Sequence, residues 1–211
     1  QKTAYEIKEC DWSSDVCSSD LGGEESGLSL EEMPAVRQRE QREAGRILGV
    51  TDIRFLNYRD GSLFPSLELR KDIVREIRRS RPDRMLIQSP ERNFERIFAS
   101  HPDHLAAGET ALQAVYPDSR NPFAFTDLKA DGFEPYRVRE VWMTGTPTAN
   151  HFVDVTETFD KKIAALHAHA SQTAHNKEMA TMVRAWGERN AALQGLAEGR
   201  LAEIFRVINT D

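Results

Sequence analysis

Cysteine is scarce in this sequence. Only two cysteines occur among the 211 residues, Cys10 and Cys17, and both lie within the first 21. The 190 residues that follow (211 − 21) contain none, which excludes from them a disulfide framework, a thiolate zinc site and a cysteine nucleophile. So little cysteine is typical of a reducing compartment, and we expect a cytoplasmic protein. We also expect the true N-terminus to be missing, so the parent protein could have carried a signal peptide that is absent from this sequence.

Three further features are absent, and each excludes a class of protein. Lys and Arg number 28 against 34 Asp and Glu, so the chain lacks the basic surplus of a nucleic-acid binder. No apolar run approaches the ~20 residues needed to cross a bilayer. No glycine-rich phosphate loop is visible. With 39% hydrophobic residues, the chain is long enough for one globular domain with a sizeable core.

The first 21 residues differ from the rest. The triplet Ser-Ser-Asp occurs twice, at residues 13–15 and 18–20, in a stretch rich in turn formers and without helical or strand periodicity. The stretch resembles a translated sequencing adapter, although a genuine polar leader is the alternative. We therefore expect residues 1–21 to be a non-native, disordered leader and residues 22–211 to form a single domain.

Hydrophobic periodicity after the leader predicts alternating helices and strands. A capping-box pattern at residues 29–32 and Gly49 bound the first helix. Further helices are expected over residues 69–77, 102–115, 159–166 and 177–193, strands over residues 52–56, 85–87, 138–144 and 152–155, and an element of uncertain type over 201–208. This alternation predicts an α/β domain, a Rossmann-like three-layer fold with a mostly parallel sheet.

The most informative motif is His101-Pro102-Asp103-His104. Pro102 suits the first position of a helix, with His101 just outside it. The motif follows the 85–87 strand by way of a polar loop, and ligands bind at the carboxyl ends of such strands. Two imidazoles three residues apart can face the same side of one turn, which favours a metal-assisted hydrolase. The alternative is a helix start with two polar neighbours.

The remaining candidates are weaker. His167, His169 and His175 do not share a helical face and are expected at the surface or in supporting roles. Arg37 and Glu40 lie one turn apart and are expected to form a solvated ion pair. The arginines at positions 75, 78, 79 and 81 are expected to be a solvated helix end.

Taken in order, several motifs of this chain together resemble the LmbE-like, or PIG-L, family of zinc-dependent de-N-acetylases, over about residues 22–208. The stretches that carry the resemblance are Arg37-x-x-Glu40, Phe55-Leu56-x-Tyr58-x-Asp60-Gly61, Arg81-Pro82-Asp83, His101-Pro102-Asp103-His104, Val153-Asp154-Val155-Thr156 and His169-x-Ser171-Gln172.

The resemblance implies a role for each matching residue. His104 is implied to be a zinc ligand. His101, when protonated, is implied to stabilise the oxyanion and to aid departure of the amine, and Asp103 to orient and tune His101. Arg37 and Asp60 are implied to contact the sugar. The rest of the substrate would be read by loops such as residues 117–125 and 146–151.

One departure from the family is serious. The family begins with a strand that ends in His-Pro-Asp-Asp, which supplies two zinc ligands and the general base, and no such motif precedes Gly22. A strand–helix–strand unit takes ~30 residues, so we expect about that much native chain, including the first strand–helix unit, to be missing. We therefore expect zinc to be held weakly and this chain to be inactive.

These observations leave three functions open. The first is a hydrolase that removes acetyl from an N-acetylglucosamine-type conjugate, a small-molecule substrate. The second is an amidase acting on a thiol conjugate. The third is a noncatalytic domain of the same fold that binds a sugar or a partner. A two-metal phosphoesterase would need more carboxylates near His101 than the sequence offers. The sequence does not decide whether the chain forms a homo-oligomer.

Overall fold

The computed structural model describes residues 32–211, apart from the side chains of residues 98 and 99. The expected leader and Ser29 of the capping box lie outside the described residues. None of the described helices has the length and apolar character required to span a membrane. The helices and strands, in chain order, are α1 (Met33–Leu48), α2 (Leu67–Ser80), β1 (Arg84–Gln88), η1 (Ile97–Ser100), α3 (Pro102–Gln113), η2 (Ala114–Asp118), α4 (Thr126–Ala130), β2 (Glu140–Thr144), β3 (His151–Asp154), η3 (Thr156–Thr158), α5 (Phe159–Ala168), α6 (Ala170–Thr173), α7 (Met179–Leu193) and β4 (Ala202–Asn209).

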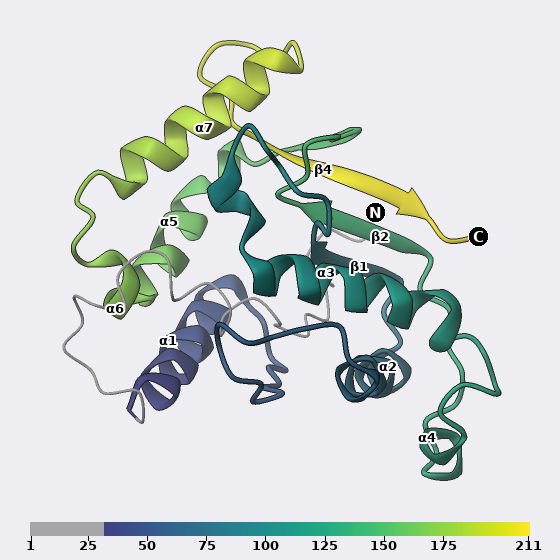
Figure 1. Ribbon diagram of the computed structural model, residues 1–211. Coiled ribbons are helices and arrows are strands. Elements are labelled where there is room, and N and C mark those ends of the chain that lie inside the picture. The colour runs from purple at the N-terminus through teal and green to yellow at the C-terminus, as the bar shows by residue number, and fades with distance from the viewer. Residues whose placement is uncertain (1–31) are drawn as a thin grey trace.

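Four strands form a mixed sheet in the order β1-β2-β4-β3 (Figure 1). Strands β1 and β2 are parallel, whereas β4 is antiparallel to both of its neighbours. The α/β fold is confirmed, but the expectation of a mostly parallel sheet holds only for the β1–β2 pair. The reason lies after α7, where Gly195 and Gly199 have φ angles of +72° and +81° and the chain turns back. The segment of uncertain type thereby becomes β4, which enters the sheet between β2 and β3.

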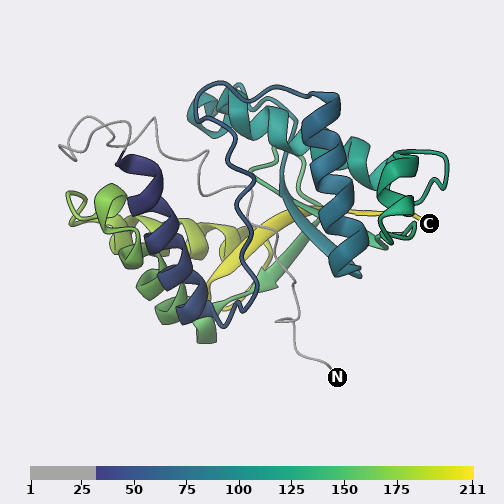
Figure 2. The same ribbon diagram turned by 90° about the horizontal axis from the view of Figure 1, so that it is seen from below.

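Helices lie on both sides of the sheet, as expected for three layers. Successive strand residues face opposite sides. Met85, Ile87 and Val141 are buried in the core together with apolar residues of α2 and α3. On the other side, Lys162 of α5 forms an ion pair with Glu203 of β4, and α1 packs against α5. Figure 2 shows α1 and α2 separated by the strands.

The boundaries of the helices follow from particular residues. Gly49 ends α1 in the left-handed conformation, with φ +88°, as predicted. Ser66 begins α2 by accepting a hydrogen bond from the backbone N–H of Leu69 at 3.1 Å. His101 plays the same part at the start of α3, where Pro102 is the first helical residue. The sequence therefore located the helix that carries His104 and is capped by His101.

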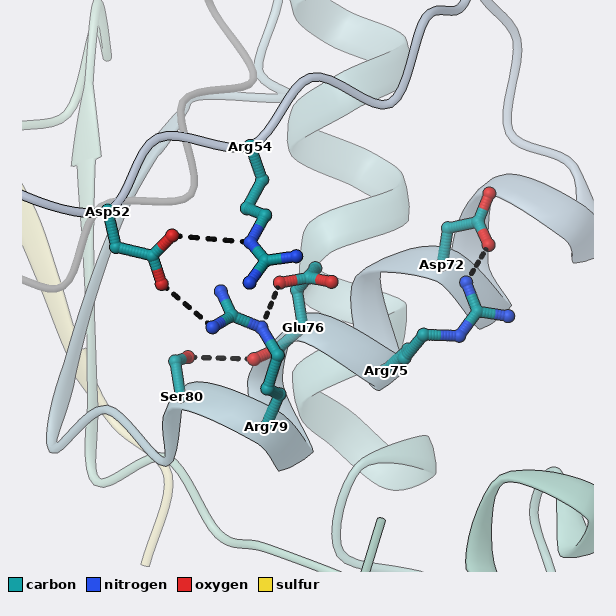
Figure 3. A network of polar contacts seen from close by, with 7 residues as sticks. All are labelled: Asp52, Arg54, Asp72, Arg75, Glu76, Arg79 and Ser80. Atoms are coloured by element: carbon teal, nitrogen blue, oxygen red, sulfur yellow. Dashed lines mark hydrogen bonds and ion pairs between the residues drawn. The ribbon is translucent and has the colours of Figure 1, made fainter. Parts of the chain in front are cut away.

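The strand predicted over residues 52–56 is wrong, because this segment has no strand next to it within the described residues. Side chains hold it instead (Figure 3). The Asp52 carboxylate accepts from Arg54 Nε at 3.2 Å and from Arg79 Nη1 at 2.7 Å. Arg79 lies on α2, so its bond to Asp52 ties the segment to this helix, where Arg79 also donates to Glu76 at 2.6 Å. The hydrogen bond from Arg79 lowers the pKa of Asp52 below its ordinary value.

Candidate functional site

The candidate site lies where β1 and β2 end. The two strands are parallel, so their carboxyl ends meet at one edge of the sheet. The Glu91 carboxylate, in the loop after β1, accepts hydrogen bonds from Thr146 Oγ1 at 2.9 Å and Thr148 Oγ1 at 2.8 Å, in the loop after β2. The loop that leads to His101 is therefore fastened to the loop at residues 145–150. Sequence reasoning missed Glu91, since nothing in its neighbourhood marks it.

Helix α3 packs directly on the end of β1. A Cβ atom at Gly108 would lie 2.4 Å from the carbonyl oxygen of Gln88, a contact closer than any real side chain makes. Only glycine lets the helix come so near. His104 precedes Gly108 by four residues and so lies on the same face of α3, one turn closer to its start. The carboxyl end of β1 therefore determines the position of His104.

The two histidines of the motif lie side by side and half-buried. Their ring centroids are 5.4 Å apart with the ring planes inclined at 53°. Nδ1 of His101 accepts a hydrogen bond from the backbone N–H of Asp103 at 3.2 Å. An accepting Nδ1 carries no proton, so the neutral ring bears its proton on Nε2. His101 thus presents one nitrogen to the helix start and keeps the other as a donor.

The Asp103 carboxylate is buried and reaches a different part of the chain. Its Oδ2 accepts from the backbone N–H of Gly61 at 2.7 Å, and its Oδ1 accepts from that of Leu63 at 3.3 Å. Asp60 and Gly61 form a turn, with Gly61 at φ +75°. The structure therefore brings together Asp60, His101, Asp103 and His104. The hydrogen bond between Asp103 and His101 is donated by the backbone N–H of Asp103, and the Asp103 carboxylate takes no part in it.

A second contact holds the segment that leads to this turn. The Tyr58 hydroxyl donates to Asp72 Oδ2 of α2 at 2.9 Å. Burial, and then this hydrogen bond to a carboxylate, raise the pKa of Tyr58 to about 12. The turn that carries Asp60 is thus fixed to α2 through Tyr58 and to α3 through Asp103.

Arg37 lies on α1, and the expected solvated ion pair with Glu40 is wrong. Arg37 is only 3% exposed, and its Nε donates to Met33 Sδ at 3.4 Å. The Glu40 carboxylate accepts from both the backbone N–H and the hydroxyl of Ser171, each at 2.7 Å. This pair of bonds joins α1 to α6. It also gives the family's His169-x-Ser171-Gln172 stretch a structural role.

Two of the weaker expectations concern positions far from the site. Arg78 does not belong to a solvated helix end, because it is 2% exposed and donates to the backbone carbonyl oxygens of residues 118, 119, 121 and 124. This loop follows the last turn of α3, and the 12 residues of α3 span ~18 Å. Figure 1 accordingly shows α4 beyond the end of α3 that is remote from its start. The 117–125 loop therefore lies at the other end of α3 from His101, whereas the loop after β2 contacts the loop that leads to His101.

The described residues do not form a zinc centre by themselves. Among residues 32–211, no three His, Cys, Asp or Glu side chains are grouped so that they could hold a metal ion. A hydrolytic zinc takes three protein ligands. The motif offers two imidazoles from a single turn, and both oxygens of Asp103 already accept backbone hydrogen bonds. Further ligands for such an ion would have to lie outside the described residues.

Comparison with a known family places the motif in a wider context. The family described as PIG-L, GlcNAc-PI de-N-acetylase, matches residues 8–115 of the chain. The match begins within the expected leader and extends through α1, α2, β1 and α3. It therefore includes Arg37, Asp60 and the motif at residues 101–104.

Two curated relatives are deacetylases of N-acetylated sugars. A diacetylchitobiose deacetylase of Thermococcus kodakarensis is 33% identical over 152 residues, which cover 72% of this chain and 55% of the relative. A probable N-acetyl-alpha-D-glucosaminyl L-malate deacetylase 2 of Bacillus anthracis is 33% identical over 149 residues, which cover 68% of this chain and 59% of the relative. The chain thus spans between half and two thirds of the length of these relatives.

Solved structures show the same fold. The N,N'-diacetylchitobiose deacetylase of Pyrococcus horikoshii, in complex with an inhibitor, is 30% identical with a TM-score of 0.79, and the match covers 89% of this chain and 68% of that one. A 4-carboxy-2-hydroxymuconate hydratase of Pseudomonas putida gives a TM-score of 0.67 at 19% identity, covering 88% of this chain and 76% of that one. This second likeness concerns the fold alone.

Proposed function

Because the chain belongs to the PIG-L (LmbE-like) family, we propose that its parent protein removes the N-acetyl group from an N-acetylglucosamine-type conjugate. The observation that carries this proposal is the position of His101, Asp103 and His104 at the carboxyl edge of β1, beside the turn that contains Asp60. The sugar deacetylases among the relatives support the substrate class. The fold alone would not, since a hydratase shares it.

The reaction is the hydrolysis of an amide. Water adds to the carbonyl carbon, the C–N bond breaks, acetate leaves, and the departing amine takes up a proton. We assign to His101 the stabilisation of the developing oxyanion and the donation of a proton to the amine. Nε2 is the nitrogen that bears the proton in the neutral ring, so it is the atom that can donate. Asp60 and Arg37 are assigned to the sugar. The assignment of Arg37 rests on the family resemblance alone, whereas the assignments of His101 and Asp60 rest also on the grouping around Asp103.

The dependence on zinc belongs to the proposal as well. His104 is the described residue that we assign to the metal. The described residues offer no complete set of three ligands, so we derive no step through the ion. The expectation that this chain is inactive by itself stays a prediction.

A noncatalytic sugar-binding domain is the second candidate. The observation that favours it is that residues 32–211 do not group three metal ligands. A thiol-conjugate amidase has less support, because the curated relatives described above are named for sugar substrates. A cytoplasmic location and a homo-oligomer remain proposals, to be tested by cell fractionation and by light scattering.

One experiment separates these candidates. The chain is incubated with zinc and N,N'-diacetylchitobiose, and zinc content, released acetate and sugar binding are each measured. His104→Ala is compared with the exposed His175→Ala as a matched control. Stoichiometric zinc with turnover, both lost only in His104→Ala, supports the deacetylase and overturns the expected inactivity. Binding of the sugar without zinc or turnover supports the binding domain. Absence of zinc, turnover and sugar binding would agree with the expected inactivity of this chain and would overturn the binding domain.

A further inference from the structure

Asp103 connects two parts of the candidate site that lie about 40 residues apart in the sequence. Its side chain is 1% exposed. A carboxylate so deeply buried must receive hydrogen bonds, and the bonds that it receives come from the backbone N–H groups of Gly61 and Leu63. Both donors lie in or directly after the turn that begins at Asp60. The carboxylate therefore holds this turn against the start of α3.

The same residue contacts His101 by another route. Nδ1 of His101 accepts from the backbone N–H of Asp103. A carboxylate that oriented the ring would instead accept a hydrogen bond from Nδ1–H. In this structure Nδ1 is itself the acceptor, and both carboxylate oxygens accept hydrogen bonds from the turn and the residue that follows it. The side chain of Asp103 and the ring of His101 are therefore not joined to each other.

We propose that Asp103 is a positioning residue for the Asp60 turn and does not tune His101 through its carboxylate. The structure assigns two tasks to this one residue: its N–H orients His101, and its carboxylate sets the turn. The turn that begins at Asp60 is thereby held against the start of α3, where the motif lies. Only the identity of the ligand that Asp60 contacts rests on the proposed function; the positioning itself rests on the hydrogen bonds.

The test compares Asp103→Asn with Asp118→Asn. An asparagine side chain has a single carbonyl oxygen to offer, so one of the two backbone amides loses its acceptor. Asp118 is a matched control, because it too is a buried carboxylate, paired with Arg70 at the far end of α3. Amide hydrogen exchange, the ¹⁵N shifts of the His101 ring and binding of N,N'-diacetylchitobiose are measured for each protein by NMR.

We expect Asp103→Asn to raise amide exchange at Gly61 or Leu63 at least tenfold and to leave the ring nitrogens of His101 unshifted. Sugar affinity should fall about tenfold, whereas Asp118→Asn should leave the turn and the affinity unchanged. Shifted His101 nitrogens with unchanged exchange at the turn would overturn the proposal in favour of tuning. If the wild-type chain binds no sugar, the proposed function fails for this chain, but the exchange and ring data still decide the positioning.

The wild-type chain provides a second measurement if Asp103→Asn does not fold. Gly61 and Leu63 lie outside the helices and strands. Their amides should nevertheless exchange at least tenfold more slowly than that of exposed Ser62 between them. Equal exchange at all three positions would overturn the proposal.

Discussion

The backbone of Gly108 in α3 packs on the carbonyl oxygen of Gln88, the last residue of β1. A Cβ atom at Gly108 would lie 2.4 Å from that oxygen and 3.0 Å from the backbone nitrogen of Pro90. Both obstacles are backbone atoms, so the helix itself must move to accept a side chain. Since His104 lies one turn away on the same face, this contact sets the distance between the histidine and the edge of the sheet.

We therefore predict that Gly108→Ala destabilises the fold. The methyl group gains up to ~1 kcal/mol in helix propensity, but overpacking against a rigid backbone costs about 1–3 kcal/mol and prevails. Urea unfolding measures the change. Gly45→Ala in α1 is the control, because the one close contact of its Cβ would be the Cδ1 end of Ile53, at 2.5 Å, which can rotate away. Equal stabilities of the two variants would contradict the prediction.

Local signals in the sequence predicted the start of α3 well. Pro102 fixes the first helical φ angle, and the polar residue before it accepts the first free N–H, so residues 101–104 suffice to locate the helix. Gly49 marks the end of α1 in the same way. Such signals operate within a few residues and need no knowledge of the rest of the chain.

Contacts between distant residues could not be predicted in this way. The segment at 52–56 has the composition of a strand, but a strand requires a neighbour, and none of the described strands lies beside it. The carboxylate of Asp103 was expected to serve His101, its neighbour in sequence, whereas its partners are Gly61 and Leu63. Only the fold determines which amide faces a buried carboxylate.

Arg78 gives a second prediction. It is the buried member of an arginine-rich helix end, and its guanidinium group donates to four backbone carbonyl oxygens of residues 118–124. Arg78→Met keeps the length of the side chain but removes these donors. Buried carbonyl groups left without a donor cost about 1–3 kcal/mol each, so we expect a loss of about 3 kcal/mol after partial rehydration.

Chemical denaturation measures this loss, and Arg75→Met on the same helix is the control. Arg75 pairs with Asp72 at the surface, with 36% of its side chain exposed, so its removal should change stability by less than ~1 kcal/mol. Arg78→Lys should not restore the wild-type value, because an ammonium group cannot reproduce the planar fork. Full rescue by lysine would show that charge alone holds the loop.

The contact between Asp52 and Arg79 predicts a dependence of stability on pH. The hydrogen bond from Arg79 lowers the pKa of Asp52, so the folded carboxyl group binds its proton less readily than the unfolded one. Its contribution to stability is therefore complete above the unfolded pKa of about 4 and is lost as the pH falls through the lower folded value. Because the side chain is half exposed, the contribution should stay below ~1 kcal/mol.

Denaturation of the wild-type chain and of Asp52→Asn, measured from pH 7 downward, checks this prediction. The wild-type chain should be the more stable near neutrality, and the difference should vanish below the folded pKa. Arg79→Met should cost more than Asp52→Asn at neutral pH, because it also removes the hydrogen bond from Arg79 to Glu76. A difference that persists unchanged at the lowest pH would show that the carboxylate charge contributes nothing.

Tyr58 predicts a titration at the alkaline end. Burial and the hydrogen bond to Asp72 raise its pKa from 10 to about 12, so the folded state holds this proton more tightly than the unfolded state. The resulting stability is complete below pH 10 and is lost as the pH rises through 12. Absorbance of the phenolate near 295 nm should show a late step that is absent from Tyr58→Phe. Tyr116→Phe, which removes a phenol that is 66% exposed, should leave that step in place. If instead the late step survives in Tyr58→Phe, the contact with Asp72 does not hold this proton, and the turn that carries Asp60 loses one of its two supports.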